Sequence, residues 1–238
     1  MSGVAELGEL FQSGAIDVAI ATVPEFFALG IDPASVTLFG SIFDGNPTDR
    51  CLLLTRADSG RNDLASLRGA TIQVFDNPRA SLANDWLDVL LLDESLPLAS
   101  DYFGRVVPTK KLSGTALPVF FRQADACLVT ETGYETLIEL NPQIGQQLQV
   151  VARSEPLVPG LGFFHPDFDG ERRNDALSAI LSVPDTEAGR QILRLFQVEA
   201  FGDIDSSYLD SARAILGRSR IYHGLDAGPH KALVGDEQ

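Results

Sequence analysis

The chain is poor in the residues that build covalent or metal-centred sites. Among its 238 residues there are only two cysteines and three histidines. Cys51 and Cys127 each lie within an apolar run, so we expect two small buried side chains rather than a disulfide or a metal pair. His165, His223 and His230 lie apart and show no ligand spacing such as His-x-x-x-His. We therefore expect neither a metal site nor a cofactor.

Positive charge is also scarce. The chain has 18 Lys and Arg residues against 33 Asp and Glu residues, which gives a formal net charge of −15. No cluster of Lys and Arg exists to neutralise a phosphate backbone, so nucleic acid is excluded as a partner. The overall charge does not define the ligand, because a local pocket can be positive on an acidic protein.

Long apolar runs are missing as well. No run approaches the roughly 18 apolar residues that a membrane span needs, so we expect no membrane insertion. The first residues, from Met1 to Glu6, have neither the basic flank nor the apolar core of a signal peptide. As written, the chain carries no export signal.

What the chain does contain is a pattern that occurs twice, 108 residues apart (position 16 against position 124). Ile16–Thr22 (IDVAIAT) and Ala124–Thr130 (ADACLVT) align without a gap. Each copy lies between two helix-like stretches, and Thr22–Glu25 (TVPE) also has the pattern of a capping box. Two copies of one helix–strand–helix unit predict two similar α/β lobes, with a ligand cleft between them.

Short strands alternate with helices along the whole chain. The expected strands are residues 16–21, 36–43, 51–56, 71–75, 106–109, 124–130, 148–152 and 162–165. The expected helices include residues 4–12, 24–29, 113–121, 170–182, 185–196 and 206–216, and one that follows residue 81. This alternation predicts an α/β fold with largely parallel sheets. The tail after Ile221 is expected to fray.

An ordered series of segments resembles a known family. Leu54–Gly60 (LTRADSG) and Leu64–Gly69 (LASLRG) resemble the hinge strand and following segment of phosphonate-type periplasmic binding proteins. The resemblance continues in order through Asp101–Val107, Gln123–Ala126, Glu135–Pro142 and Leu148–Ser154, and covers roughly residues 5–215. This family is the solute-binding component of ABC importers for phosphonate, phosphite or phosphate.

The resemblance implies a two-lobed α/β fold of the type 2 periplasmic-binding-protein kind, with two hinge strands that close on the ligand. The hinges would be Cys51–Arg56 and Leu148–Ser154. Lobe 1 would combine residues 1–55 with residues 155–238, and lobe 2 would hold residues 56–154. An ABC permease is the implied partner and the periplasm the implied location, although a genuine start at Met1 would make the chain cytoplasmic.

The beginning of the chain departs from the family. Family members begin with an export signal and a strand–helix–strand unit before the first copy of the repeat, whereas this chain starts in the helix just before it. We expect the sheet of lobe 1 to lack an interior strand, and so to expose apolar surface and unpaired backbone groups. Either the chain is a fragment or has a mis-called start, which we favour, or a partner covers that edge.

The expected pocket departs from the family too. The phosphonate binders present a Ser-Thr-Ser loop at a helix N-terminus of the second lobe, and the matching place here is Arg79-Ala80-Ser81. Phe26 stands where a tyrosine is often found, and Leu112 where a histidine is found. The resemblance therefore supports the fold more firmly than it supports a particular ligand.

Candidate ligand contacts lie where strands end and helices begin. In open α/β sheets ligands bind beyond the carboxyl ends of the strands, where unpaired N–H groups favour an anion. Arg79 would supply a bidentate fork for a carboxylate or phosphonate, and Glu131 would bind an amino group or favour its helix N-terminus. Helix capping is the structural alternative for the threonine and serine candidates, and core packing for the phenylalanine. The full candidate set is Thr22, Phe26, Arg79, Ser81, Thr109, Thr130 and Glu131.

Three functions remain open at this point. The favoured one is a solute-binding protein that captures a small anion for an ABC importer. The others are a ligand-sensing module coupled to a histidine kinase and a cofactor-biosynthesis enzyme on the same fold. The chain has no Gly-x-Ser-x-Gly elbow, no Gly-x-x-x-x-Gly-Lys loop and no paired metal ligands, so we expect no enzymatic activity.

Overall fold

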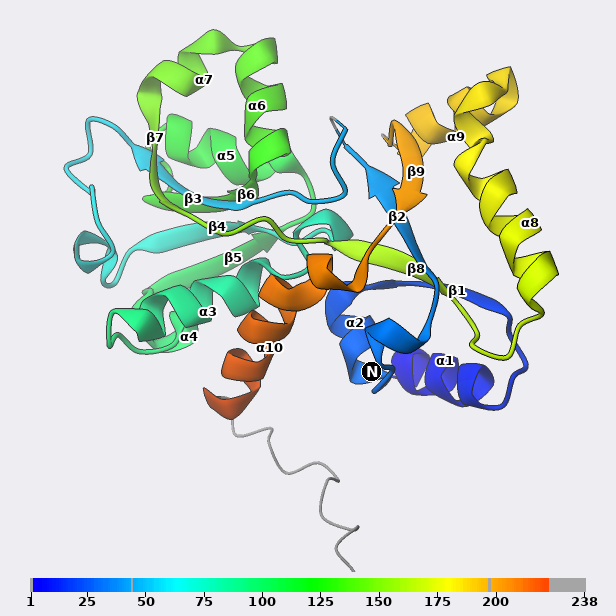
Figure 1. Cartoon of the computed structure of the whole chain (residues 1–238). Coiled ribbons are helices and arrows are strands. Elements are labelled where there is room, and N and C mark those ends of the chain that lie inside the picture. Colours follow the sequence, from blue (N-terminus) through cyan, green and yellow to red (C-terminus); the bar gives the residue numbers. More distant parts are fainter. Residues whose placement is uncertain (1, 44, 197, 223–238) are drawn as a thin grey trace, which may run out of the picture.

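Two sheets divide the molecule into two lobes (Figure 1). The computed structural model describes residues 2–43, 45–196 and 198–222, so most of the tail predicted to fray lies outside the described residues. The first lobe holds a four-stranded sheet in the order β1-β8-β2-β9, and the second a five-stranded sheet in the order β5-β4-β6-β3-β7. The two-lobed α/β fold predicted from the repeat is confirmed.

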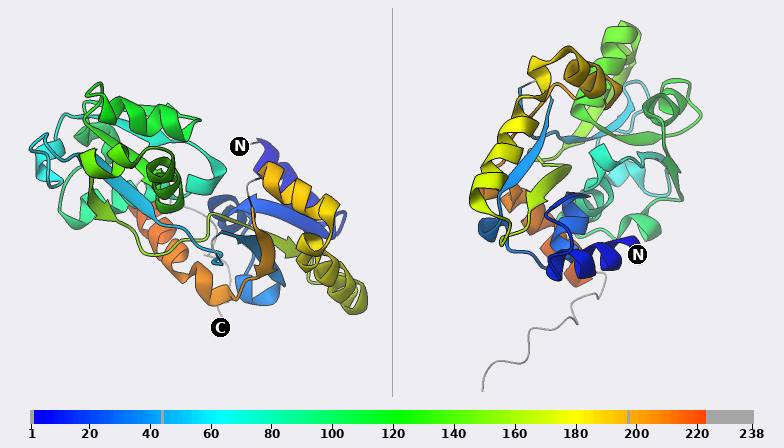
Figure 2. Two further views of the ribbon diagram at one scale, coloured as in Figure 1. Left: turned by 90° about the horizontal axis from the view of Figure 1, so that it is seen from above. Right: turned by 90° about the vertical axis from the view of Figure 1, so that its right-hand side faces the viewer.

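Each sheet is accompanied by its own helices (Figures 1 and 2). The strands of the first lobe are β1 (Val18–Thr22), β2 (Leu38–Ile42), β8 (Gly160–Phe164) and β9 (Ala200–Asp203), and its helices are α1 (Ser2–Gln12), α2 (Val23–Ala28), α8 (Gly170–Leu181) and α9 (Glu187–Phe196). The strands of the second lobe are β3 (Cys51–Arg56), β4 (Thr71–Phe75), β5 (Arg105–Thr109), β6 (Ala126–Thr130) and β7 (Leu148–Arg153). Its helices are α3 (Ala83–Asp93), α4 (Ala99–Tyr102), α5 (Leu112–Phe120), α6 (Glu131–Leu140) and α7 (Pro142–Gln147), and α10 (Asp210–Tyr222) follows the first lobe.

Both copies of the repeated pattern fold as a strand whose last threonine caps a helix. At the start of α2, the Glu25 N–H donates to Thr22 Oγ1 at 3.4 Å, and the Thr22 N–H donates to Glu25 Oε2 at 2.9 Å. At the start of α6, the Gly133 N–H donates to Thr130 Oγ1 at 3.2 Å. The predicted capping box is confirmed, and the two copies occupy equivalent places in the two lobes.

The prediction of largely parallel sheets is wrong for the first lobe. Its three strand pairs, β1/β8, β2/β8 and β2/β9, are all antiparallel. The second sheet is mixed, because β4 is parallel to β5 and β6 whereas β3 is antiparallel to β6 and β7. Parallel neighbours are usually joined by a helical crossover within one lobe. β8 is not connected in this way, because the chain enters it directly from the second lobe. The strand β9 was not predicted, since four half-buried or exposed residues show little periodicity.

The strands predicted as hinges lie within the second sheet. β3 is buried along almost its whole length and pairs with β6 on one side and β7 on the other. The chain instead passes between the lobes in the segments that end at Arg50 and begin at Ser154. These segments meet in a backbone bridge between Asp49 and Leu157, with N···O distances of 2.9 and 2.8 Å. A strand as apolar as Cys51–Thr55 needs neighbours on both sides, so it cannot serve as an exposed link.

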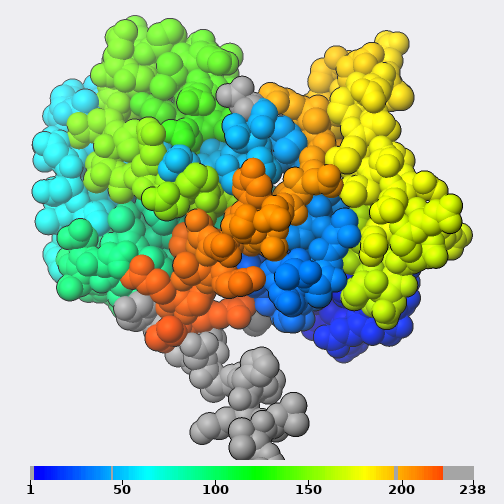
Figure 3. All heavy atoms as spheres, viewed as in Figure 1, coloured from blue at the N-terminus to red at the C-terminus, as the bar shows by residue number. Residues whose placement is uncertain are grey.

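The helix α10 forms a third link between the lobes. It packs on α3 of the second lobe, where Arg218 pairs with Asp93 and the Ser219 Oγ donates to Asp85 Oδ1 at 2.7 Å. On the first lobe, the guanidinium carbon of Arg213 lies 5.7 Å from the ring centre of Phe27 in α2. Figure 3 shows this segment along the junction of the two lobes. The predicted assignment of all residues after 155 to lobe 1 therefore does not describe α10.

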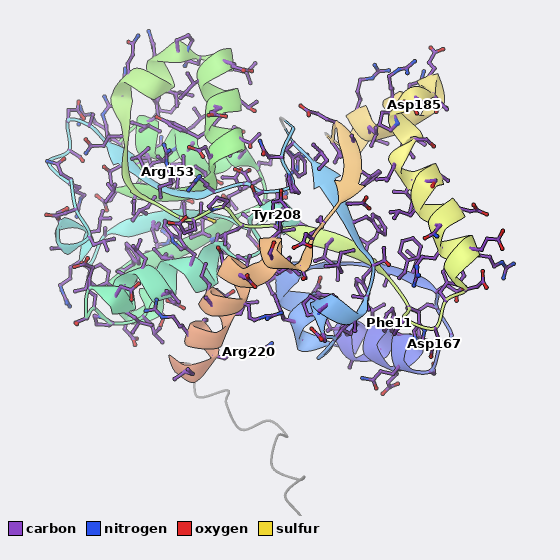
Figure 4. The ribbon with its side chains drawn as sticks, in the orientation of Figure 1. Phe11, Arg153, Asp167, Asp185, Tyr208 and Arg220 are labelled. Carbon is purple, nitrogen blue, oxygen red and sulfur yellow. The ribbon has the colours of Figure 1, made fainter. Side chains whose placement is uncertain are left out.

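Aromatic packing forms the core of the first lobe. Phe163 in β8 is fully buried, and its ring centre lies 5.0 Å from those of Phe11 in α1 and Phe26 in α2. Figure 4 labels Phe11 beside the first-lobe sheet. The helices α1 and α2 thus cover the face of the sheet on which Phe163 lies.

The two cysteines are small core residues, as predicted. Cys51 and Cys127 are free and buried in the second sheet. Burial raises the pKa of each thiol to about 12. Both thiols therefore stay protonated at neutral pH and are poor nucleophiles.

Candidate functional site

A cavity of about 540 Å³ lies between the open face of the first-lobe sheet and a turn of the second lobe. We call it the sheet-face cavity. The first lobe contributes residues of β1, β2, β8 and β9, and the second lobe contributes Pro78 and Arg79. Its polar side chains include Thr22, Glu25 and Ser41, whereas most of its wall is apolar. This volume is large enough for a small organic molecule.

Arg79 is the cation that lines the sheet-face cavity. It lies in the 3-10 turn Pro78–Ala80, where the Arg79 N–H donates to Asn77 Oδ1 at 3.0 Å. Its guanidinium carbon lies 4.6 Å from the ring centre of Phe43. Burial lowers the pKa of Arg79, and the nearby Asp49 carboxylate acts in the opposite direction. A half-buried cation at the meeting of two lobes favours an anion at this place.

Next to this cavity the two lobes are in direct contact. Arg79 and Thr130 line a narrow crevice of about 10 Å³, with room for about one water molecule. The Ser81 Oγ donates to the Pro159 carbonyl at 2.6 Å, and the Val23 N–H donates to the same oxygen at 3.1 Å. The structure therefore brings Thr22, Arg79, Ser81 and Thr130 together around Pro159.

The hydroxyl groups of the predicted threonines are engaged by neighbours. Thr22 Oγ1 donates to Glu25 Oε2 at 2.7 Å, and Thr130 Oγ1 accepts from the first turn of α6. Thr109 Oγ1 shares a hydrogen bond of 2.5 Å with Thr115 Oγ1. Helix capping and strand-end bonding therefore account for much of what these side chains do. Since α2 has six residues, its dipole is also a weak source of anion affinity.

Three other predicted residues, Phe26, Thr109 and Glu131, line neither the sheet-face cavity nor the crevice. Phe26 is fully buried in the core described above and lines none of the cavities described here. Glu131 lies between two arginines, with Oε2 at 3.6 Å from Arg50 Nε and Oε1 at 3.1 Å from Arg153 Nη2. Arg153 is labelled in Figure 4, in the second lobe. The carboxylate of Glu131 thus ties α6 to the end of one crossing segment, at Arg50, and to the last residue of β7, Arg153, which precedes the other.

Three residues that shape the site were not predicted from the sequence. Phe43 carries the ring below Arg79, and Pro159 provides a carbonyl oxygen for both lobes. Asp49 Oδ1 accepts the N–H groups of Arg50 at 2.7 Å and Thr132 at 3.2 Å. The polar run after Phe43 was a usable signal for Asp49. The role of Pro159 could not be predicted, because it depends on a backbone carbonyl oxygen, which every residue has.

A family model decides the relationship of this chain to known proteins. The model described as "ABC transporter, phosphonate, periplasmic substrate-binding protein" matches residues 1–209. The chain belongs to this family. The resemblance seen in the sequence is thereby confirmed. Proteins of this phosphonate-binding family are periplasmic substrate-binding components of ABC transporters.

Solved structures share the fold of this phosphonate-family chain. PhnD1 from Prochlorococcus marinus, in complex with methylphosphonate, is 14% identical, with a TM-score of 0.63 over 92% of this chain and 84% of that one. A binding protein component of an ABC phosphonate transporter from Pseudomonas aeruginosa is 16% identical, with a TM-score of 0.62 over 96% and 77%. XAC2383 from Xanthomonas citri, bound to ATP, is 14% identical, with a TM-score of 0.67 over 93% and 84%. No curated protein matches the chain.

Membrane spans and metal clusters are both absent from the described residues. In that part of the chain, no helix combines the length and the apolar character needed to cross a membrane. The same residues hold no group of three or more His, Cys, Asp or Glu side chains placed to bind a metal ion.

Proposed function

We propose that this chain captures a small anionic ligand between its two lobes and delivers it to the permease of an ABC importer in the periplasm. The observation that carries the proposal is the half-buried guanidinium of Arg79. The second lobe holds this group against a cavity whose remaining walls, apart from Pro78, belong to the first lobe. An anion on Arg79 would therefore contact both lobes and link its own binding to their relative position.

Arg79 is the principal ligand contact in this proposal, and Thr22, Ser81 and Thr130 surround it. A guanidinium presents a planar fork that matches a carboxylate, a sulfonate or a phosphonate. A bound anion would also offset the burial that lowers the pKa of Arg79. The hydroxyl of Ser81 has one proton, which it now donates to Pro159, so contact with the ligand would replace that bond.

The remaining predicted residues would support the site without touching the ligand. Phe26 holds α2 against the first-lobe sheet, and Thr109 fixes the end of β5 through Thr115. Glu131 holds the first turn of α6 against Arg50 and Arg153.

The wall of the sheet-face cavity favours an organic anion over inorganic phosphate or phosphite. Phe39, Phe43 and Phe201 present aromatic surface, and Ile20 adds an aliphatic side chain. Such a wall gains about 0.8 kcal/mol for each CH₂ group that it buries. A bare oxyanion would gain nothing from it and would lose hydration. The ligand class that fits is a phosphonate, sulfonate or carboxylate with an apolar substituent.

Thermal denaturation with a panel of anions tests the proposal. The panel contains phosphate, phosphite, methylphosphonate, longer alkylphosphonates, alkylsulfonates, carboxylates and ATP. A ligand present at about 100 times its Kd stabilises the folded state by about 2.7 kcal/mol, which corresponds to a Tm increase of about 5–10 °C. We expect the longer alkylphosphonates to exceed phosphate. A panel in which no anion raises Tm would contradict the proposed function.

The substitution Glu131→Gln tests which side chain contacts the ligand. Because the Glu131 carboxylate faces Arg50 and Arg153, the change should leave the Kd of the best anion within about threefold. The arginines are 34% and 52% exposed, so the free energy of unfolding should fall by less than about 1 kcal/mol. Isothermal titration and urea denaturation give the two values. A loss of affinity above about tenfold would instead indicate that Glu131 binds the ligand directly.

A further inference from the structure

The charges that line the sheet-face cavity cancel each other. Among the described residues of its wall, Glu25 and Arg79 are the only ones with a charged side chain. Glu25 belongs to the first lobe and Arg79 to the second. The Glu25 carboxylate is held in place, because its Oε2 accepts the N–H and the hydroxyl of Thr22 at 2.9 and 2.7 Å. The cavity therefore presents one charge of each sign to a ligand.

The crevice beside this cavity has no excess of positive charge either. In the described part of its wall, the charged side chains are Asp49, Arg50 and Arg79. Burial lowers the pKa of Arg79, and the Asp49 carboxylate opposes this effect. Arg50 is engaged by the carboxylate of Glu131, and the Cys51 thiol stays protonated because burial raises its pKa to about 12. Together with the carboxylate in the sheet-face cavity, three carboxylates surround two cations.

Asp49 fills the place at the start of α6 where an anion would bind. Its Oδ1 accepts the N–H groups of Arg50 at 2.7 Å and Thr132 at 3.2 Å. The Gly133 N–H donates to the hydroxyl that caps the helix. The Asp49 backbone is fixed by its two hydrogen bonds to Leu157. The N–H groups of Thr132 and Gly133 are therefore used within the chain, and a carboxylate of the protein stays close to the proposed ligand.

We propose that the site selects anions with a single negative charge, and that Asp49 is the residue that discriminates against a second charge. This inference rests on the proposed function, in which Arg79 holds the ligand. Arg79 matches the first negative charge of a ligand. A second charge would be repelled by Asp49 and Glu25, and Arg50 is already engaged elsewhere. Because these groups are partly buried, solvent and salt screen the repulsion less than at an open surface.

The selection defines the ligand class more narrowly. An organic sulfonate or carboxylate carries one negative charge and fits in its ordinary ionised form. An alkylphosphonate changes from one to two negative charges as the pH rises through neutrality, as a phosphate ester does. It would therefore bind in its singly charged form. The affinity for a phosphonate should fall as the pH rises, whereas the affinity for a sulfonate should not.

Isothermal titration with two ligands of the same chain length tests the inference. The ligands are butylsulfonate and butylphosphonate, each titrated at about pH 6 and about pH 8.5. We expect the Kd of butylphosphonate to rise at least about fivefold between the two pH values, because its doubly charged form is repelled. The Kd of butylsulfonate should stay within about twofold, and this ligand also reports any titration of the protein itself.

The substitution Asp49→Asn tests which residue discriminates. Asparagine keeps a side-chain oxygen for the N–H groups of Thr132 and Arg50 but removes the charge. Loss of one negative charge helps a doubly charged ligand about twice as much as a singly charged one, so the preference for butylsulfonate at pH 8.5 should fall at least about threefold. Asp63→Asn is the matched control. Asp63 Oδ1 also accepts an N–H, from Ser66 at 2.8 Å, but Asp63 follows the end of β3 remote from the crevice.

Each outcome supports or contradicts the inference. A pH-dependent Kd for butylphosphonate alone, with a reduced sulfonate preference in Asp49→Asn and an unchanged one in Asp63→Asn, supports it. A butylphosphonate Kd that stays constant or falls as the pH rises would overturn it, although the proposed function would stand. So would an equal sulfonate preference in wild type and Asp49→Asn, or an equal change in the two variants. If neither ligand binds the wild-type protein at either pH, the proposed function fails and the inference fails with it.

Discussion

Replacing Phe26 with alanine lowers the free energy of unfolding by about 3–5 kcal/mol. Phe26 is fully buried, and its ring centre lies 5.0 Å from that of Phe163 and 5.7 Å from that of Phe27. The substitution removes most of this contact surface and leaves a cavity between α2 and the sheet. α2 has only six residues, so it depends on packing for its stability. Urea denaturation followed by circular dichroism measures the loss.

Two further variants show whether the loss comes from the core. Phe26→Leu keeps most of the apolar volume and should cost less than about 1.5 kcal/mol. Phe27→Ala removes a half-buried ring that lies against Arg213, and should cost less than Phe26→Ala. A ligand-contact role for Phe26 predicts a different pattern, with a stable Phe26→Ala protein that has lost affinity for its anion. That pattern would contradict the packing seen in the first lobe.

Arg79→Gln weakens binding of the anion by about 10–150-fold. Hydrogen bonds to a charged group are worth about 1.5–3 kcal/mol, and each 1.4 kcal/mol is a factor of about ten in Kd. Glutamine keeps hydrogen-bonding capacity but has no charge and no planar fork. The backbone of the turn is held by the Asn77 side chain, so the substitution should leave the fold intact. Isothermal titration of the two proteins with the best anion of the panel measures the change.

Arg50→Gln is the matched control for the charge. Arg50 lines the same crevice as Arg79, but its guanidinium bonds to the Ser154 carbonyl at 2.8 Å and pairs with Glu131. Its loss should weaken anion binding by less than about threefold, because its guanidinium is already engaged by Ser154 and Glu131. An equal loss of anion affinity in Arg50→Gln and Arg79→Gln would show that the site attracts anions only through its overall positive electrostatic potential and not through a direct contact with Arg79.

Much of the fold could be predicted because its signals are local. The repeated strand with its terminal threonine, the capping box at Thr22 and the β4 strand at Thr71–Phe75 are all encoded within a few neighbouring residues. Strand direction in the first lobe was not encoded in this way. The antiparallel pairing of β8 with β1 and β2 arises because the chain enters β8 directly from the segment that crosses between the lobes. No local sequence pattern predicts such a connection. The placement of α10 against α3 likewise depends on side chains far apart in the chain, such as Arg218 and Asp93.

The candidate site was predictable to a smaller extent. The rule that ligands bind where strands end and helices begin selected four residues that meet around Pro159, namely Thr22, Arg79, Ser81 and Thr130. The surroundings of each side chain were not predictable, because they come from the contact between lobes. The ring below Arg79 and the arginines that flank Glu131 belong to segments distant in sequence. Phe26 follows the end of a strand, where a ligand contact was expected, but the packing of Phe163 against it places it in the core.

A crystal structure with the anion that gives the largest thermal shift tests the central claim most directly. The anion is predicted to lie between the lobes, with its oxygens about 2.7–2.9 Å from the guanidinium nitrogens of Arg79 and its apolar part against Phe39 or Phe201. The Ser81–Pro159 hydrogen bond should be replaced by a bond from Ser81 to the ligand. An anion bound elsewhere, with Arg79 still over Phe43 and no contact to it, would contradict the account.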